Sequence, residues 1–287
     1  MENVKIITDS ASDLPMDVIK QYDIDVLPLT VVEEDTEYKD GVTIMPNEVF
    51  TKMREGISFT TSQVTTHDYY QKFEEYILGD RPCIYVGFSS GLSGSFQASV
   101  LAKNQLIQEY GEERCKLRVI DTKCASLGFG LVVLAAAKEA KKGKNLEELC
   151  AIVQEKSAKM AHVFTVMNLT YLQRGGRLSK GAAVIGNLLN VCPILNVDDE
   201  GKLKVLEVAR GNKKLFKRIL EIMRENGEDL SNQTIGIVHG DDLKVVEELK
   251  GLITEKFGTQ NFIIRSVGSV IGAHTGPEVV SVFYLKK

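Results

Sequence analysis

Residues 83–99 read CIYVGFSSGLSGSFQAS, and this stretch decides the fold. It begins with an apolar run over residues 83–88, which is typical of a strand buried on both faces. A turn of glycines and serines follows, and residues 95–110 then show the periodicity of a helix. A buried strand that runs through a short turn into a helix is the repeating unit of parallel α/β sheets. The stretch therefore predicts an α/β protein.

The same alternation of strands and helices continues on both sides of this stretch. It predicts strands at residues 4–7, 24–32 and 117–122, and helices at residues 48–54, 67–78, 128–142 and 145–160. Asp13 stands just ahead of Leu14 and Pro15, and we expect its side chain to cap the helix that follows. Together these segments predict a Rossmann-like N-terminal domain over residues 1–160, with a parallel sheet and helices on its faces.

The pattern changes near residue 160. Strands are predicted at residues 162–167, 194–197, 204–209, 234–239, 262–267 and 279–285, with helices at residues 211–226 and 242–256. The sequence DDEG at residues 198–201 indicates a tight turn that joins two of these strands as an antiparallel hairpin. We therefore predict a C-terminal α+β domain over residues 161–287, with a mixed or antiparallel sheet, packed tightly on the first domain.

Composition and charge exclude several classes of partner. Among the 287 residues, 35 are Lys or Arg and 39 are Asp or Glu, which gives a net charge of −4. Such a chain generates no field that would attract nucleic acid or an anionic membrane. The longest nearly apolar run, residues 127–137, is too short to cross a bilayer. We therefore expect a soluble protein with no nucleic-acid partner and no integral membrane contact.

The cysteines and histidines indicate neither disulfides nor a metal site. The five cysteines include no CxxC pair, and their odd number and spacing are typical of reduced, buried thiols. Reduced thiols fit a cytoplasmic location, which we expect for this chain. His67, His162 and His239 lack the spacing of metal ligands, so we assign them structural roles and expect no metal.

The glycine- and serine-rich turn after residue 87 is the strongest chemical signal. A helix that begins there presents free N–H groups and the positive end of its dipole, which together bind anions. A tight turn with serine caps explains the same residues without any ligand. The turn also matches GxSxG, the pattern of a hydrolase nucleophile, with Ser89 as nucleophile and Asp241 and His274 downstream. A serine hydrolase therefore stays open as an alternative function.

Three further segments carry polar side chains that a plain structural loop does not need. TTSQ at residues 60–63 is expected between two helices, and GAHTGP at residues 272–277 precedes the last predicted strand. LTYLQRGGRLS at residues 169–179 places Arg174 and Arg177 around two glycines. A purely structural role at the end of a strand or helix would explain each of these segments. Each also has a functional reading as a contact for an anion or a partner.

Taken together, the motifs resemble the DegV family of bacterial lipid-binding proteins, which includes the fatty-acid-binding B subunit of fatty acid kinase. The matching motifs are TDSASDLP (8–15), TSQ (61–63), SSGLSGSFQAS (89–99), VIDTKCASLGFG (119–130), LTYLQRGGRLS (169–179), PIL (193–195), ARGNKK (209–214) and GAHTGP (272–277). They follow the family order over nearly the whole chain. Two departures stand out: Val64 where the family usually has Pro, and Glu278 where Gly is common.

The resemblance implies a non-catalytic protein that holds one long-chain fatty acid between its two domains. It assigns the hydrogen bonds to the carboxylate to Thr61 and Ser93, assisted by N–H groups near Ser62 and Gly94, with His274 close by. It implies neither a metal nor a cofactor. It also implies that Ser89 is a structural residue of the loop and not a nucleophile.

The resemblance further implies a partner. In the kinase system, the binding protein presents the carboxylate to a separate catalytic subunit, which phosphorylates it with ATP. Arg177, together with Arg174 and Arg210, is then expected to contact the kinase or the acyl phosphate. The chain length and unsaturation of the acid depend on the shape of the pocket, which the sequence leaves open.

Overall fold

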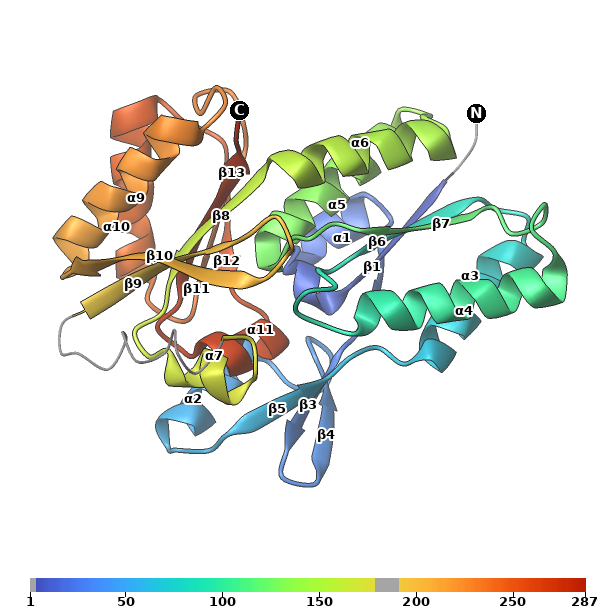
Figure 1. Ribbon diagram of the computed structural model, residues 1–287, viewed down its shortest axis with the longest axis horizontal. Helices are drawn as coiled ribbons and strands as arrows, with labels where there is room; N and C mark the ends of the chain where they lie inside the picture. The colour runs from blue at the N-terminus through green and yellow to red at the C-terminus, as the bar shows by residue number, and fades with distance from the viewer. Residues whose placement is uncertain (1–3, 179–190) are drawn as a thin grey trace.

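Three β-sheets organise the chain in the computed structural model, which describes residues 4–178 and 191–287. Two of the sheets lie side by side with helices packed around and between them, and the third projects below them (Figure 1). Both sequence-based expectations about the sheets, a parallel one followed by a mixed one, are confirmed.

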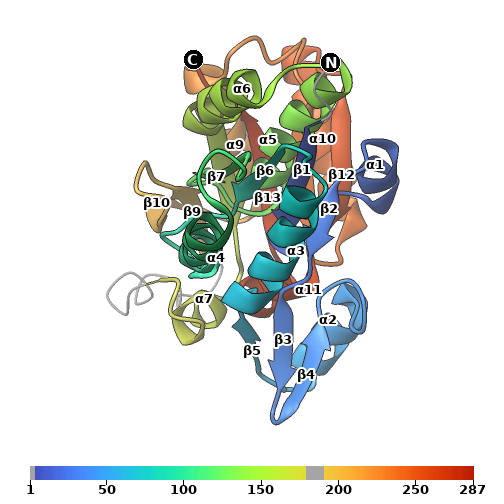
Figure 2. The same cartoon turned by 90° about the vertical axis from the view of Figure 1, so that its right-hand side faces the viewer.

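The first sheet is parallel and has the strand order β2-β1-β6-β7. Its strands are β1 (Lys5–Asp9), β2 (Asp25–Leu27), β6 (Cys83–Gly87) and β7 (Leu117–Asp121). Every residue of β1 and β6 is buried, because helices cover both faces of the sheet. The helices of this part are α1 (Met16–Gln21), α3 (Thr66–Leu78), α4 (Ser95–Tyr110), α5 (Ser126–Lys141) and α6 (Leu146–Lys159), with the short 3-10 helix η1 (Ser10–Ser12). Helices α3 and α4 pair on one face, and α5 and α6 on the other (Figures 1 and 2).

The second sheet is mixed, with the order β10-β9-β8-β13-β11-β12. Its strands are β8 (Met160–Thr165), β9 (Val191–Val197), β10 (Leu203–Arg210), β11 (Ile235–His239), β12 (Phe262–Ser266) and β13 (Val280–Leu285). Only the β11–β12 pair is parallel among the described pairings. Helices α9 (Asn212–Asn226) and α10 (Leu243–Phe257) pack on one face over an apolar core. Beyond the predicted elements, the chain forms α7 (Thr170–Arg174) and α11 (Ser269–Thr275).

Helix α5 packs between the two large sheets. It contacts β1 and β6 of the first sheet and β8, β11 and β13 of the second. Its sequence begins with the long apolar run noted above, and all but one of the first eight residues of the helix are buried. A helix that is apolar all round is expected where both of its sides face protein. Across the part of the chain that the structure describes, none of the helices combines the length and apolar character needed to cross a bilayer.

The third sheet was not predicted. It is antiparallel, with the order β4-β3-β5, and consists of β3 (Thr30–Glu33), β4 (Thr36–Lys39) and β5 (Phe59–Ser62), beside helix α2 (Pro46–Arg54). The strand predicted over residues 24–32 is in fact two strands in different sheets, separated at Pro28. Proline has no N–H for a sheet ladder, so the chain changes sheets there. The TTSQ segment is largely strand β5 instead of a loop.

The prediction that Asp13 caps helix α1 is wrong. The residue before that helix is Pro15, and no side chain caps the helix. Asp13 instead has a left-handed backbone conformation, with φ 49°, and its carboxylate turns away from α1. It accepts hydrogen bonds from the Gly268 N–H at 2.9 Å and the Ser126 hydroxyl at 2.5 Å. Asp13 therefore joins the N-terminal part of the chain to the start of α11.

Candidate functional site

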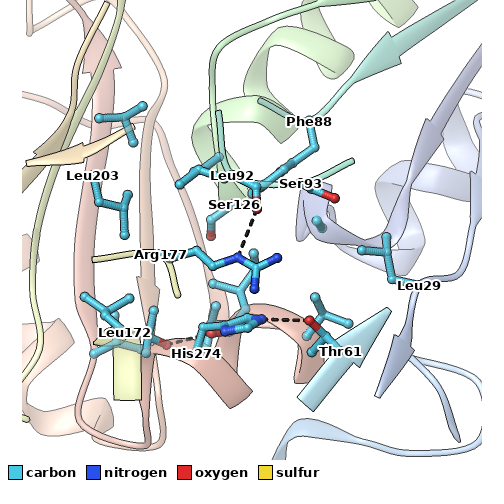
Figure 3. A pocket seen from close by; sticks show the side chains of 18 of the residues that line it. Leu29, Thr61, Phe88, Leu92, Ser93, Ser126, Leu172, Arg177, Leu203 and His274 are labelled. Atoms are coloured by element: carbon cyan, nitrogen blue, oxygen red, sulfur yellow. Dashed lines mark hydrogen bonds between the residues drawn. The ribbon is translucent and has the colours of Figure 1, made fainter. Parts of the chain in front are cut away.

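A cavity of about 330 Å³ is lined by residues of the two large sheets and of strand β5. Most of its lining is apolar and comes from both halves of the chain. The apolar lining residues are Ala11, Leu29, Phe88, Leu92, Ala125, Phe164, Leu172, Val197, Leu203, Val267, Val270, Ile271, Val279 and Phe283. Figure 3 shows leucines and a phenylalanine around a central space, with Arg177 extending into it between Ser93 and the pair Thr61 and His274. The arrangement is that of a pocket for a largely apolar molecule with a polar head.

Polar groups from three separate segments meet at one end of this cavity. Strand β5 supplies Thr61 and Ser62, the turn after β6 supplies Ser93 and Gly94, and α11 supplies His274. Each comes from the end of an element, where side chains and free N–H groups face away from the regular hydrogen-bond ladder. Gly94 directly precedes helix α4, so the positive end of the α4 dipole faces this end of the cavity. The site can therefore bind an anion.

Thr61 and His274 form the central contact of the polar end. Thr61 Oγ1 lies 2.7 Å from His274 Nε2, as the dashed line in Figure 3 marks. Burial, together with the charge of Arg177, lowers the pKa of His274 to about 4. The imidazole is therefore neutral near pH 7. If its Nε2 carries the hydrogen, it donates to Thr61 and leaves the threonine hydrogen free for a ligand.

Arg177 extends into the same end of the cavity. Its Nε donates to the Leu92 carbonyl at 3.0 Å, and its Nη1 donates to the Gly175 carbonyl. Burial lowers the pKa of this half-buried guanidinium. Among the described residues no carboxylate pairs with it, so its charge is available to a bound anion. Gly175 has to be glycine, because a Cβ there would lie 2.1 Å from His274 Nδ1.

A second cavity adjoins the first at the polar end. It has a volume of about 160 Å³ and shares Thr61, Arg177 and His274 with the larger cavity. Its lining also includes the exposed Arg174, whose Nη1 donates to the Ser58 hydroxyl at 2.9 Å. The three shared side chains therefore lie between the larger, mainly apolar cavity and the smaller one, called the outer cavity below, which has a second arginine.

The structure brings together most of the residues singled out in the sequence. Thr61, Ser62, Ser93, Gly94 and His274, the five residues expected at a carboxylate, all line the larger cavity. Of the three arginines expected at a partner, Arg177 lines both cavities and Arg174 lines the outer one. Arg210 is exposed at the end of β10 and lines neither. Ser179, the last residue of the LTYLQRGGRLS motif, lies outside the described residues.

The two departures from the family pattern lie outside both cavities. Val64 is buried and belongs to the main hydrophobic core. Glu278 is exposed and lines neither cavity, so it does not add charge to the lining. Sequence reasoning did not identify most of the apolar lining, for example Phe164 and Phe283. His162, for which it predicted a structural role, also lines the cavity, where its Nε2 accepts from the Ala125 N–H at 3.0 Å.

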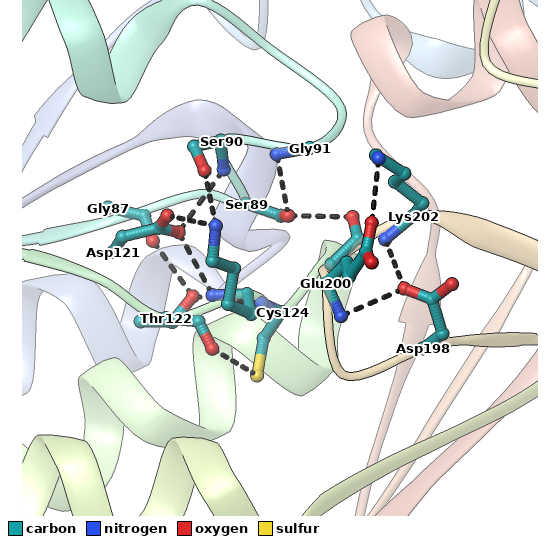
Figure 4. A network of polar contacts seen from close by, with 12 residues as sticks. Gly87, Ser89, Ser90, Gly91, Asp121, Thr122, Cys124, Asp198, Glu200 and Lys202 are labelled. Atoms are coloured by element: carbon teal, nitrogen blue, oxygen red, sulfur yellow. Dashed lines mark hydrogen bonds and ion pairs between the residues drawn. The ribbon is translucent and has the colours of Figure 1, made fainter.

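The structure does not assemble the triad of a serine hydrolase. Ser89 is fully buried and donates to the Gly201 carbonyl at 2.7 Å, as Figure 4 shows. His274 contacts Thr61, and Asp241 pairs with Arg54. A nucleophilic serine needs a histidine within hydrogen-bond reach, and the histidine needs its own acidic partner. Ser89 instead joins the serine-rich turn to the hairpin between β9 and β10.

Ser90 and its neighbours strengthen that junction. Asp121 accepts from the Ser90 N–H at 3.1 Å and pairs with Lys123 at 2.8 Å, and Lys123 also donates to the Ser90 hydroxyl (Figure 4). Val197 and Leu203, on the two strands of the hairpin, both line the larger cavity. The hairpin therefore closes one side of the cavity, and the serine-rich turn fixes the hairpin in place.

Fold and site together define a class: a three-sheet α/β protein with a mainly apolar pocket that has a group of polar side chains at one end. The family model of DegV, described as an uncharacterised protein family, matches residues 3–287. The chain belongs to the DegV family.

Relatives that match this chain over nearly its full length belong to the same family. A DegV domain-containing protein of Clostridium perfringens is 38% identical over 99% of this chain and 98% of its own. A solved structure described as fatty acid binding of a DegV family protein from Thermus thermophilus has a TM-score of 0.88 and 31% identity, covering 100% of both chains. A DegV lipid-binding protein from Thermotoga maritima has a TM-score of 0.86 and 30% identity, covering 100% of this chain and 99% of its own.

Proposed function

We propose that this protein binds one long-chain fatty acid, with the acyl chain in the larger cavity and the carboxylate at its polar end. The observation that supports the proposal is the one-sided polarity of the cavity. Hydroxyls, a helix N-terminus and Arg177 converge at one end, whereas the walls are apolar. Of the further polar residues in the lining, three already have partners: Ser126 donates to Asp13, His162 accepts from the Ala125 N–H, and Thr275 donates to the Ile271 carbonyl.

In this proposal the two parts of the ligand have different roles. Burial of an acyl chain contributes roughly 0.8 kcal/mol per methylene before the costs of ordering and association. A buried carboxylate costs several kcal/mol unless it is paired and hydrogen-bonded. Thr61 and Ser93 supply hydrogen bonds from the side chains of β5 and the serine-rich turn, and Arg177 supplies the opposite charge. The chain therefore gives affinity, and the polar end selects an acid over an alcohol or an ester.

The proposed ligand lies between two domains, residues 1–160 and residues 161–287. The lining supports this, since Thr61, Ser93 and Leu29 come from the first part and Arg177, His274 and Leu203 from the second. We further propose that the protein is a carrier that performs no chemistry itself, needs no cofactor and acts in the cytoplasm. All five cysteines are buried and unpaired, as is usual in a reducing compartment.

The carrier is proposed to present the carboxylate to a fatty acid kinase. The outer cavity supports this, because it reaches Thr61 and His274 from the side that carries the exposed Arg174. Reversing that charge in Arg174→Glu is expected to abolish acyl-phosphate formation by a fatty acid kinase catalytic subunit with ATP, while fatty-acid binding persists. Undiminished acyl-phosphate formation by this variant would exclude Arg174 from the kinase contact. Arg210→Glu tests the third arginine in the same assay.

Organic extraction of the purified protein tests the binding function. Mass spectrometry of the extract is expected to show an intact long-chain fatty acid in about equimolar amount with the protein. After removal of the lipid, hexadecanoic acid is expected to bind and hexadecanol to bind far more weakly, because only the acid pairs with Arg177. An extract without fatty acid, combined with no binding of added hexadecanoic acid, would refute the proposal.

A further inference from the structure

Ser281 is a polar residue in the apolar wall of the larger cavity. It is the one serine or threonine in strand β13, which reads VSVFYL, and it is only 5% exposed. Its neighbours across the sheet are Phe164 on β8 and Val238 on β11. Phe283 on β13 and Val279 just before the strand lie two residues away on the same face. Because Phe164, Val279 and Phe283 line the cavity with Ser281, its hydroxyl lies among apolar side chains.

The Ser281 hydroxyl has no hydrogen-bond partner within the part of the chain that the structure describes. The other polar side chains of this wall differ from it, since Ser126, His162 and Thr275 all have partners. Gln63 belongs to the polar end, where it directly follows strand β5. Ser281 therefore gives the apolar wall one hydroxyl that is available to a ligand.

The position of Ser281 is that of a contact for the acyl chain. Strand β13 contacts helix α5, whereas α11, which holds His274, contacts β5. Two residues beyond Ser281, the ring of Phe283 meets that of His162 edge to face, with centroids 5.5 Å apart. A Cβ on Gly128 of α5 would lie 2.7 Å from Phe283 Cδ1, so β13 and α5 are in close contact there. A fatty acid held by its carboxylate at the polar end therefore reaches Ser281 with its chain.

A plain methylene chain is a poor match for this hydroxyl. Water can bond to Ser281 in the empty protein, but an acyl chain that fills the cavity expels that water and offers only C–H groups. A polar group that is buried without a hydrogen bond lowers the affinity for such a ligand. A hydroxyl on the ligand is a good match, because each of the two hydroxyls can donate one hydrogen and accept another. Both groups then keep a partner inside the cavity.

We propose that Ser281 is a specificity-determining residue, and that the protein prefers a long-chain fatty acid with a hydroxyl group part-way along its chain to the unsubstituted acid. The inference rests on the proposed function, since the same cavity and the same carboxylate site hold the ligand. It deepens that function by naming the class of fatty acid. The polar end and Ser281 are two fixed points of the protein, so the ligand hydroxyl has to lie at a defined distance from the carboxylate.

A series of hydroxyoctadecanoic acids that differ in the position of the hydroxyl tests this proposal. Lipid-free protein is titrated with each acid, and with octadecanoic acid, by displacement of a fluorescent fatty acid. The wild type is expected to bind one member, or a few with adjacent positions, roughly 3- to 10-fold more tightly than octadecanoic acid. Members with the hydroxyl elsewhere on the chain are expected to bind more weakly than octadecanoic acid, because their hydroxyl meets only apolar side chains.

Ser281→Ala separates the hydroxyl from the small size of the residue, which also leaves room for a bent or branched chain. This variant is expected to lose the preference: the favoured hydroxy acid binds about tenfold more weakly than to the wild type. Octadecanoic acid binds more tightly, because the partnerless hydroxyl is gone. Ser281→Cys, which is similar in size and only a weak hydrogen-bonding group, is the second variant and should lose most of the preference too.

Thr165→Val is the matched control. The hydroxyl of Thr165 on the neighbouring strand β8 is also buried with no partner in the described residues, but Thr165 does not line the cavity. This variant should keep the wild-type preference. A wild type that binds octadecanoic acid at least as tightly as every member of the series, or a Ser281→Ala variant that retains the preference, would overturn the inference and leave the proposed function intact. A wild type that binds neither octadecanoic acid nor any member would overturn both.

Discussion

Thr61 on β5 and His274 on α11 are 213 residues apart in the chain, yet Thr61 Oγ1 and His274 Nε2 lie 2.7 Å apart. Strand β5 is held by its register with β3, in which Thr61 faces Val31, and α11 is held at its start by Asp13 and Asp40. The two polar groups therefore meet because two rigid elements place them there. A donor held in this way loses little entropy when a ligand arrives.

Thr61→Val removes the hydroxyl and keeps the shape of the side chain. A charge-assisted hydrogen bond contributes about 1.5–3 kcal/mol, so affinity for hexadecanoic acid is expected to fall roughly 10- to 100-fold. Displacement of a fluorescent fatty acid measures the effect. Thr36→Val, on the exposed strand β4, is the control and should bind like the wild type. Equal affinity of Thr61→Val and wild type would remove Thr61 from the carboxylate site.

Arg177 connects ligand binding to the titration of His274. Arg177→Gln removes the charge, so fatty-acid binding is expected to weaken by tenfold or more. Loss of the same charge should raise the pKa of His274 from about 4 toward its ordinary value, although burial still holds it below that value. An NMR titration of the imidazole measures this change. Arg210→Gln, which lines neither cavity, is expected to alter neither quantity.

This expectation revises one drawn from the sequence. Local charge and the family resemblance together assign Arg177 to a contact with the kinase or the acyl phosphate, and give it no part in fatty-acid binding. The structure places its guanidinium beside Leu92 and Gly175 in the lining of the cavity. The direction in which an arginine extends depends on how the end of α7 packs against a turn some 80 residues earlier. The pattern of neighbouring residues does not contain that information.

The parallel sheet could be predicted because its signals are local. Residues 83–88 are apolar throughout, and a helical period follows a glycine-rich turn. Strand β5 could not, since TTS is polar and its pairing with β3 joins residues about 30 positions apart. Asp13 illustrates the same limit: its position before Pro15 indicates a helix cap, but its partner is an N–H 255 residues away. The three segments that hold the five residues of the polar end are recognisable from their polar side chains alone, but the choice of these five residues depends on the family resemblance.

Asp13 gives a prediction about stability and pH. Burial raises the pKa of Asp13 to about 7, against the charge of Arg265 and the hydrogen bond from Ser126. The folded state therefore holds a proton that the unfolded state has lost, and this contribution to stability disappears as the pH rises from about 4 to 7. Asp13→Asn has no such loss. Its free energy of unfolding relative to wild type should increase with pH across this window, by at most about 1.4 kcal/mol per unit.

Urea unfolding at pH 5 and pH 7.5 measures this difference. Asp25→Asn is the control, because the pKa of Asp25 is shifted in the opposite direction, downward. Although burial opposes it, hydrogen bonds from Tyr76 and Lys5 lower the pKa of Asp25. Asp25 is therefore ionised in both states throughout this window, and Asp25→Asn should be destabilised equally at the two pH values. A constant difference between Asp13→Asn and wild type would show that Asp13 is ionised in the folded protein at pH 5.

Gly201→Ala tests how the hairpin between β9 and β10 is fixed over the cavity. Gly201 has φ +77°, and a Cβ there would lie 2.1 Å from Ser89 Oγ. Gly258 has nearly the same conformation, φ +74°, with no neighbour within 4 Å of a Cβ. Gly258→Ala is therefore the control for backbone strain, about 1–2 kcal/mol. Gly201→Ala should cost roughly 1–3 kcal/mol more, measured by urea unfolding, because the clash disrupts the bond from Ser89 to the Gly201 carbonyl.

Displacement of the hairpin also moves Val197 and Leu203, so this variant alone is expected to bind fatty acid more weakly. Equal destabilisation of the two variants would mean that Ser89 and the hairpin tip do not hold each other in place.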